Sequence, residues 1–190
     1  LVAWLDHLDP AGDDLRLRHS HPAWVVERLG EALAADGAPD ELPALLAADN
    51  APPAVTLVAR PGRITRDDLL SQVEGTPTPR SPYGVVLAGG DPGAVPAVRD
   101  GLAGVQDEGS QLVAVALAEA PLEGADDRWL DLCAGPGGKA ALLAGLAADR
   151  GAHLVANEVA PHRAELVRRS LRGMPGDPEV SVADGREGPW

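Results

Sequence analysis

The chain has 190 residues, of which 45% are hydrophobic and 24% charged, and its formal net charge at pH 7 is −13. This length allows one or two small domains with a real core. The single cysteine, Cys133, excludes a disulfide framework. No apolar run of about 18 residues and no secretory leader pattern is present. We therefore expect a cytoplasmic protein without a membrane span.

Acidic charge is concentrated in the first two thirds of the sequence. Residues 1–125 hold 8 basic and 19 acidic side chains, whereas residues 126–190 hold 8 and 10. Nucleic-acid-binding domains usually carry a basic footprint, so the charge argues against RNA as a partner. Local basic clusters are interpreted as solvated faces rather than phosphate sites: Arg16, Arg18, His19 and His21; Arg60, Arg63 and Arg66; Arg163, Arg168, Arg169 and Arg172.

Residues 1–50 are predicted to be mainly helical. Residues 23–35 form an amphipathic pattern in which Trp24 is expected to be a core residue. A second helix is predicted over residues 40–49, with Asp40 as its N-cap and Pro43 in its first turn. The Pro-Pro pair at 52–53 ends this segment.

Residues 51–104 are predicted to form a small α+β module. Strands are expected at 55–59 and 83–88, with a helix that Thr65 opens and that ends near Val73. Residues 76–82 contain three prolines and are predicted to be a loop, and residues 96–102 about one helical turn.

Residues 105–190 alternate between helix and strand patterns. Asp107 is predicted to cap a helix over 108–119, and a linker at 121–127 leads to a strand that starts near Arg128. A helix over 140–148, a strand over 153–158, a helix from Pro161 and a strand over 180–185 follow. In the last helix Leu166, Val167 and Leu171 form the apolar stripe. This order predicts an α/β fold, the N-terminal half of a Rossmann-type sheet.

The glycine-rich turn between the first strand and its helix is the most informative segment. It runs Cys133, Ala134, Gly135, Pro136, Gly137, Gly138 and Lys139. A dinucleotide fingerprint needs one more glycine, and a P-loop needs Ser or Thr where Ala140 stands. Pro136 also removes one donor N–H. A less charged ligand such as S-adenosyl-L-methionine therefore fits the turn better than a polyphosphate, and a nucleotide-dependent oxidoreductase remains an alternative.

Two acids follow the next strands. Glu158 lies about 20 residues beyond the loop, where an acid accepts hydrogen bonds from ribose hydroxyls in doubly wound folds. Asp184 ends the third predicted strand, from where it could meet the exocyclic amine of an adenine. Lys139 is predicted either to contact the cofactor or an RNA phosphate, or to be a solvated first-turn residue. The five histidines show no metal-ligand spacing with the cysteine or the acids, so no metal site is expected.

The segment Asp-Leu-Cys-Ala-Gly-Pro-Gly-Gly-Lys at 131–139 resembles the first cofactor motif of the Sun/Fmu (RsmB-like) RNA cytosine-5 methyltransferases. Val-Gln-Asp-Glu-Gly-Ser-Gln at 105–111 and Asp-Gly-Arg at 184–186 resemble two further family segments, and 21–24 and 50–53 resemble the entry to its RNA-recognition region. The resemblance implies an S-adenosyl-L-methionine site that includes Arg163, a recurrent family arginine. It also implies RNA as partner, with small-subunit ribosomal RNA the bacterial default. The expected domains are 1–50, 51–104 for substrate recognition, and 105–190 for the cofactor.

The family adds a cysteine thiolate to C6 of cytosine, which makes C5 nucleophilic, and its cysteines lie in Pro-Cys and Thr-Cys motifs. Neither motif occurs here. Cys133 is therefore interpreted as a small, buried loop residue rather than the nucleophile, and the chain as an inactive fragment of a longer enzyme. Alternatives remain: a methyltransferase for another substrate, or a non-catalytic interaction module. The sequence does not indicate an oligomeric state.

Overall fold

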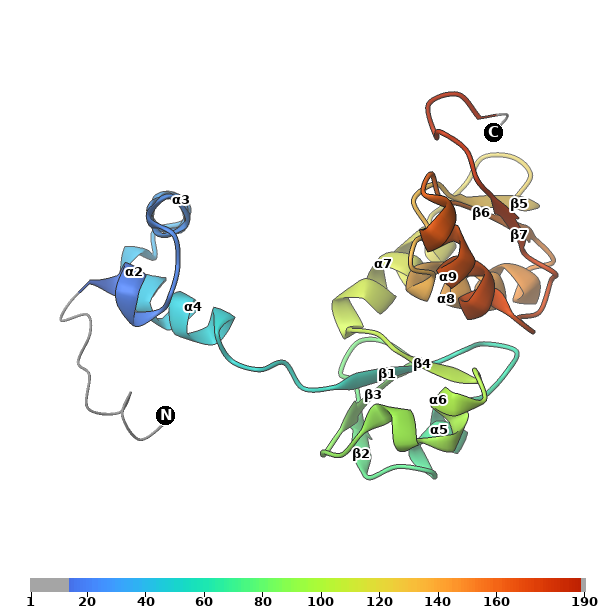
Figure 1. Cartoon of the computed structure of the whole chain (residues 1–190), viewed down its shortest axis with the longest axis horizontal. Helices are drawn as coiled ribbons and strands as arrows, with labels where there is room; N and C mark the ends of the chain where they lie inside the picture. Colours follow the sequence, from blue (N-terminus) through green and yellow to red (C-terminus); the bar gives the residue numbers. More distant parts are fainter. Residues whose placement is uncertain (1–13, 189–190) are drawn as a thin grey trace. The chain divides into compact units, whose positions relative to one another are not determined.

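The computed structural model describes residues 14–188 and divides into two compact units, Leu1–Pro53 and Ala54–Trp190 (Figure 1). The first unit is helical in its described part. It consists of α2 (Leu15–Arg18), α3 (Ala23–Ala35), the 3₁₀ turn η1 (Pro39–Glu41) and α4 (Leu42–Asp49). The bounds of α3 confirm the predicted helix. The predictions that fall on residues 1–13 lie outside the described residues.

Two predictions for this unit are wrong. Asp40 does not cap α4, because Pro39 starts a separate 3₁₀ turn that contains Asp40, and Glu41 takes the N-cap position without a side-chain hydrogen bond. Trp24 is 68% exposed instead of packed in a core. The reason is that the described helices of this unit enclose a single buried side chain, Leu46, which is too small a core to cover an indole.

The second unit begins with an antiparallel sheet of order β2-β3-β1-β4. Its strands are β1 (Thr56–Ala59), β2 (Gly75–Pro77), β3 (Gly84–Leu87) and β4 (Ala103–Val105). Helices α5 (Arg66–Leu70) and α6 (Pro96–Arg99) and the turn η2 (Pro92–Ala94) connect them. The Thr65 hydroxyl accepts the Asp68 N–H at 3.1 Å, which confirms the predicted start of α5. Apolar side chains such as Leu57, Leu69 and Val85 form the core of this module.

A parallel sheet of order β5-β6-β7 follows, with strands β5 (Arg128–Asp131), β6 (His153–Asn157) and β7 (Glu179–Ser181). Helices α8 (Gly138–Asp149) and α9 (Pro161–Leu171) are its crossovers and pack against each other and against the sheet (Figure 1). Alanines and leucines of α8 make the core together with Trp129, Leu154 and Val167. The apolar stripe of α9 uses Val167 and Leu171 as predicted, but Ala164 is buried where Leu166 was expected, and Leu166 is 41% exposed.

Strand β7 is shorter than the predicted strand over 180–185, because the side chain of Asn157 takes over hydrogen bonds that a longer strand would make with its backbone. Asn157 Nδ2 donates to the carbonyls of Leu132 and Ala183 at 3.1 Å each, and Ala183 N–H donates to Asn157 Oδ1 at 3.1 Å. A side-chain amide thus satisfies backbone groups that a continued strand would pair. Asp184 consequently lies three residues beyond the end of β7.

Helix α7 (Glu108–Glu119) joins the two sheets of this unit, and its Asp107 cap accepts the Gly109 N–H at 2.8 Å as predicted. Gln111 is fully buried. Its amide donates to the Gln106 carbonyl at 2.8 Å and the Leu57 carbonyl at 3.3 Å, and it accepts the Ser81 hydroxyl at 2.6 Å. These bonds fix the start of α7 to the antiparallel sheet, so the 105–111 segment holds a set position beside the glycine-rich turn.

Candidate functional site

The glycine-rich turn leaves the carboxyl end of β5 and enters α8 through Gly137, which has a φ of 111°. A Cβ at Gly137 would lie 2.6 Å from the Ser170 Cβ, and one at Gly135 would lie 2.2 Å from Glu158 Oε2. A side chain at Gly137 would therefore be strained by the backbone conformation as well as by the clash, and one at Gly135 would displace the carboxylate of Glu158. The first intrahelical bond of α8 runs from Ala141 N–H to the Gly137 carbonyl, so the N–H groups of residues 138–140 precede the ladder and form the positive end of the helix.

Glu158 ties the turn to the next crossover. It follows β6 and is 4% exposed. Its Oε2 accepts the Gly135 N–H at 3.1 Å and its Oε1 accepts the Ala160 N–H at 3.0 Å. Arg163 on α9 completes the arrangement: its Nη2 donates to the Gly135 carbonyl at 2.6 Å, and its Nε lies 3.6 Å from Glu158 Oε2. The acid and the arginine predicted from sequence therefore both contact the glycine-rich turn.

Two hollows flank the turn. The first, called the β6 hollow, has a volume of about 520 Å³, within the range of about 300–1,000 Å³ typical of small-molecule sites. It is lined by Leu132, Cys133, Asn157, Glu158, Val159, Arg163, Asp184, Gly185 and Arg186. The second, called the α7 hollow, has a volume of about 260 Å³. It is lined by Val105, Gln106, Asp107, Ser110, Asp131, Cys133, Ala134, Gly135, Pro136, Gly138 and Lys139.

Acidic groups in the two hollows differ in their electrostatics. Burial raises the pKa of Asp131 in the α7 hollow above its ordinary value, opposed by the Cys133 N–H and by the charge of Lys139. In the β6 hollow, hydrogen bonds from the Arg186 side chain and N–H lower the pKa of Asp184. Arg186 Nε and N–H both donate to Asp184 Oδ1 at 3.0 Å. These bonds favour the charged form of Asp184, which lines the same hollow as Glu158.

Nine of the ten predicted cofactor residues line these hollows, and the tenth, Gly137, is buried. Lys139 is exposed at the start of α8 and lines the α7 hollow. The predicted burial of Cys133 is wrong: its thiol is free and exposed. Its neighbour Ala134 is buried instead, and the Ala134 N–H donates to the Asn157 carbonyl at 2.8 Å.

The structure adds lining residues that the sequence reasoning did not assign to the site: Leu132, Asn157, Val159, Gly185, Arg186, Gln106 and Asp131. Asn157 carried a usable signal, since a polar residue at the end of an otherwise apolar strand needs partners. Gln106 could have been assigned to the site because it belongs to the 105–111 segment, which resembles a family segment. Asp131 and Leu132 belong to the 131–139 motif, and Gly185 and Arg186 to the 184–186 segment, so membership of these motifs was their signal. Val159 had no such signal.

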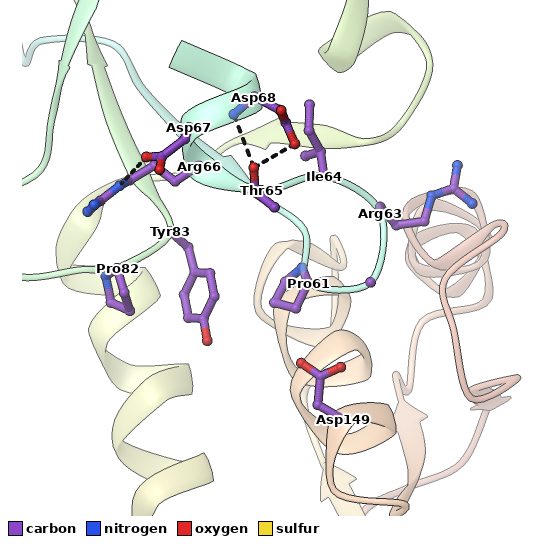
Figure 2. Close-up of a pocket in the computed structure, with 11 residues that line it drawn as sticks. Pro61, Arg63, Ile64, Thr65, Arg66, Asp67, Asp68, Pro82, Tyr83 and Asp149 are labelled. Atoms are coloured by element: carbon purple, nitrogen blue, oxygen red, sulfur yellow. Dashed lines mark hydrogen bonds and ion pairs between the residues drawn. The ribbon is translucent and has the colours of Figure 1, made fainter. Parts of the chain in front are cut away.

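A third hollow of about 540 Å³ lies away from the glycine-rich turn, between residues 61–68, Tyr83 and the end of α8 at Asp149 (Figure 2). Two of its polar groups have neighbours on the same loop: the Thr65 hydroxyl donates to Asp68 at 2.6 Å, and Arg66 Nε lies 3.9 Å from Asp67 Oδ1. Arg63 on its wall donates to the Gly173 carbonyl.

The arginines at 60 and 63 have a structural role that neither sequence interpretation included. Arg60 Nη1 donates to the carbonyls of Gly101 and Ser170 at 3.0 Å each, and burial lowers its pKa. Together with the bond from Arg63 to Gly173, these contacts attach the loop after β1 to the C-terminal end of α9. Cations at this end of a helix are favoured by its dipole.

Among residues 14–188 no group of three His, Cys, Asp or Glu side chains is arranged to hold a metal ion. In the same described range, no helix combines the length and the apolar character needed to cross a membrane.

Comparison with known proteins places these features in a family. Residues 117–189 match the model of 16S rRNA methyltransferase RsmB/F. "Putative methyltransferase Rv1407" of Mycobacterium tuberculosis is 53% identical over 168 residues, which cover 88% of the chain and 36% of the relative. Ribosomal RNA small subunit methyltransferase B of Pseudomonas syringae is 32% identical over 193 residues, covering 98% of the chain and 40% of the relative.

Solved structures agree in fold. The crystal structure of PH0851 superposes with a TM-score of 0.79 at 20% identity, covering all of the chain and 43% of that protein. A methyltransferase homologue from Pyrococcus horikoshii gives a TM-score of 0.72 at 21% identity, covering 93% and 56%. The chain spans about two fifths or less of the curated relatives described above. From the family match, these relatives and the Rossmann-like fold, the chain belongs to the RsmB/F methyltransferase family.

Proposed function

We propose that this chain carries the S-adenosyl-L-methionine site of an enzyme that methylates C5 of a cytosine in small-subunit ribosomal RNA. The observation that carries the proposal is the position of Glu158. It is buried at the end of β6, contacts the glycine-rich turn and faces the same hollow as Asp184. An acid after the second strand of a Rossmann-type sheet is where a ribose is bound.

In this proposal the β6 hollow holds the adenosine part of the cofactor. Each oxygen of Glu158 already accepts one backbone N–H, and a carboxylate has about four acceptor positions, so ribose hydroxyls have places left. Asp184 accepts from the adenine amine. Arg163 holds the Gly135 carbonyl and so keeps the turn closed against the ligand. Bound S-adenosyl-L-methionine would supply the activated methyl group.

The nucleophile is a separate matter. The family resemblance implies that a cysteine of a Pro-Cys or Thr-Cys motif adds to C6 of the cytosine, and neither dipeptide occurs in these 190 residues. Cys133 lies in the cofactor turn and is preceded by Leu132, so it belongs to neither of these motifs. We therefore expect this chain to bind the cofactor without transferring the methyl group.

Residues 51–104 are proposed to recognise the substrate, with 1–50 as a helical segment and 105–190 as the cofactor domain. The antiparallel and parallel sheets each have an apolar core, which supports a boundary near residue 104, while Val58 of β1 packs into the core of the parallel sheet and joins the two parts in one compact unit. The relatives named as ribosomal RNA methyltransferases support RNA as the substrate. A ribosomal RNA substrate in turn supports a cytoplasmic location.

Calorimetric titration of the 190-residue chain with S-adenosyl-L-methionine, with NADH as the comparison ligand, tests the proposal. We expect saturable binding of the former alone, and weaker binding by a Glu158→Ala variant. An Asp68→Ala variant is the matched control, since Asp68 lies in the third hollow, away from the turn. Binding of NADH alone would favour an oxidoreductase, and equal binding by Glu158→Ala would remove the proposed role of this acid.

A further inference from the structure

Arg60 has a guanidinium that is bonded to carbonyls through one nitrogen only. Its Nη1 donates to the Gly101 and Ser170 carbonyls at 3.0 Å each, whereas its Nε is buried and has no hydrogen-bond partner. Burial and the charge of Arg63 lower the pKa of Arg60, and no carboxylate within residues 14–188 opposes them. A cation drawn out of water without an anionic partner is unfavourable, so this side chain calls for an explanation.

The edge of Arg60 that lacks a partner is the one that binds anions. In a guanidinium, Nε and Nη2 form a fork that matches two oxygens of a carboxylate or a phosphate. Arg16 uses this edge on Asp14, at 2.9 Å from Nε to Oδ1 and 2.5 Å from Nη2 to Oδ2. Arg186 uses it on Asp184, at 3.0 and 2.5 Å. Two arginines of the same chain thus show the contact that this edge of Arg60 is suited to make.

Arg60 lines a hollow of about 360 Å³, called the α9 hollow, together with residues of β4, of α9 and of the glycine-rich turn. Arg169 on α9 is its second basic residue, and no acidic residue of the described range lines it. Gly138, the first residue of α8, brings the positive end of that helix to it. The hollow is therefore electropositive, and its two arginines come from different basic clusters of the sequence.

Gly104 leaves the fork of Arg60 uncovered. A Cβ at this residue would lie 3.3 Å from Arg60 Nη2 and 3.8 Å from Arg60 Nε. Gly104 also lines the α9 hollow. An oxygen atom of a ligand could therefore occupy the space beside the fork that a side chain at residue 104 would fill.

The rim of the α9 hollow is exposed and partly apolar. The side chain of Arg169 is 65% exposed and its pair with Glu165 is a surface pair, while Val105 is 58% and Leu166 41% exposed. An extended polymer fits such a rim better than an enclosed metabolite does, since apolar side chains can contact riboses while the arginines hold a phosphate.

The α9 hollow is distinct from the proposed cofactor site. It adjoins the α7 hollow through the buried Gln106 and through Gly138, but Asp131 and Lys139 do not line it. It lies between the module proposed to recognise the substrate and the turn proposed to hold the cofactor. A strand that reaches from one to the other would cross it.

We propose that the α9 hollow binds a backbone phosphate of the RNA substrate, held by the fork of Arg60 and the guanidinium of Arg169. This inference rests on the proposed function, because it takes RNA as the substrate. A phosphate contact fixes the position of a strand without reading its bases. The site would therefore position the strand relative to the cofactor, and the choice of sequence would be made elsewhere.

Solution NMR of the ¹⁵N-labelled 190-residue chain, titrated at low salt with a single-stranded uridine pentanucleotide, tests the proposal. The Nε–H signal of Arg60 and the amide signals of Gly104 and Ser170 should shift along one binding curve. Arg169→Gln should weaken the RNA about fivefold or more, and Arg168→Gln less than about twofold. Arg168 is the matched control, since it also pairs with Glu165 on α9 but does not line the hollow.

Gly104→Ala is the second variant, because it keeps both arginines and places a methyl group against the fork of Arg60. It should weaken the RNA about threefold or more. Calorimetry with S-adenosyl-L-methionine accompanies each variant. Equal affinity for this ligand in all of them would show that they are folded and that the cofactor hollows are unchanged.

Three outcomes would overturn the inference. Equal weakening by Arg168→Gln and Arg169→Gln would reduce the effect to general charge. Shifts of the same signals by inorganic phosphate, but not by the RNA, would make this a free-phosphate site. If S-adenosyl-L-methionine binds and the RNA moves none of these signals, the phosphate site is wrong and the proposed cofactor binding stands. If neither ligand binds, the proposed function fails and this inference fails with it.

Discussion

Glu158 shows how one side chain serves structure and ligand binding together. Its two oxygens accept N–H groups from the glycine-rich turn and from the start of α9, so it would hold the site in shape before a ligand arrives. From the sequence, an acid at this position could be predicted to bind a ribose. Its contacts with the glycine-rich turn could not be predicted, because they depend on the folded path of the backbone at Gly135 and Ala160. An acid at this position therefore affects stability as well as affinity.

Replacing Glu158 with glutamine should lower the free energy of unfolding by about 1–3 kcal/mol. One oxygen would become an NH₂ group facing a backbone N–H, so a buried donor would lose its acceptor. The measurement is urea unfolding followed by circular dichroism. Glu165→Gln on α9 is the matched control, because Glu165 is half exposed and its ion pairs with Arg168 and Arg169 are surface pairs. A cost for Glu165→Gln as large as that for Glu158→Gln would contradict the prediction.

Asp131 predicts a pH dependence of stability. Burial raises its pKa in the folded chain above the unfolded value near 3.8. The native state therefore binds the proton more tightly, so this group favours folding below the unfolded pKa, and that contribution is lost as pH rises through the folded pKa. Asp131→Asn should raise stability relative to the unmodified chain at pH 7, and the difference should shrink towards pH 3. Thermal unfolding across this range measures it, and a pH-independent difference would count against the assignment.

At the scale of elements, α8 contains a glycine that a helix would ordinarily disfavour. Gly145 faces the loop after β1, where a Cβ would lie 2.5 Å from the Pro61 carbonyl oxygen and 2.8 Å from the Pro61 Cβ. A Cβ on Gly30 in α3 would have one neighbour within 4 Å, Leu42 Cδ2 at 3.4 Å. Gly145 thus faces backbone atoms at short distance, whereas Gly30 faces only the end of a leucine side chain.

Gly145→Ala should destabilise the second unit by roughly 1–3 kcal/mol, because the overlap with backbone outweighs the gain of about 1 kcal/mol in helix propensity. Gly30→Ala should stabilise the first unit by up to about 1 kcal/mol, since a flexible leucine end can give way. Hydrogen exchange of amides in α8 and α3 measures each unit by itself. Stabilisation of α8 by Gly145→Ala would show that the loop moves aside freely.

The helices and strands that could be predicted from the sequence are those marked by a capping residue or by an apolar pattern within their own residues. Helix α7 has the bounds predicted from its Asp107 cap, and α3 follows its apolar pattern. Strands β2 and β4 were missed because each has three residues, one of them glycine, and exists through pairing with β3 and β1. The early end of β7 depends on the Asn157 side chain. In the site, residue types could be predicted, whereas the division into two hollows and the burial of Gln106 depend on how α7 is held against the turn.

At the scale of the whole molecule, charge is the property that bears on RNA. The net charge is −13, and many arginines are engaged locally. Arg60 and Arg63 bind backbone carbonyls, and Arg168 and Arg169 lie beside Glu165. The Nη1 donors of Arg60 and Arg63 are thus committed to carbonyls, and the charges of Arg168 and Arg169 are offset by Glu165, which reduces what these clusters offer to phosphates.

The chain alone should therefore bind a small-subunit ribosomal RNA fragment no more tightly than the range of about 10⁻⁴–10⁻⁶ M typical of non-specific binding at physiological salt. Fluorescence anisotropy with a labelled RNA, repeated at several salt concentrations, is the measurement. A shallow dependence on salt is expected, because few counterions would be released. Nanomolar binding with a steep salt dependence would show a basic surface that the charges do not indicate.

The exposed thiol of Cys133 makes this protein convenient for spectroscopy. It is the single cysteine of the sequence, and it lines both hollows at the glycine-rich turn. A maleimide fluorophore would therefore attach at one defined position, without removal of other cysteines. Because the dye would stand between the two hollows, its emission would respond to a ligand in either one, and blocked labelling in the presence of a ligand would report occupancy of the turn.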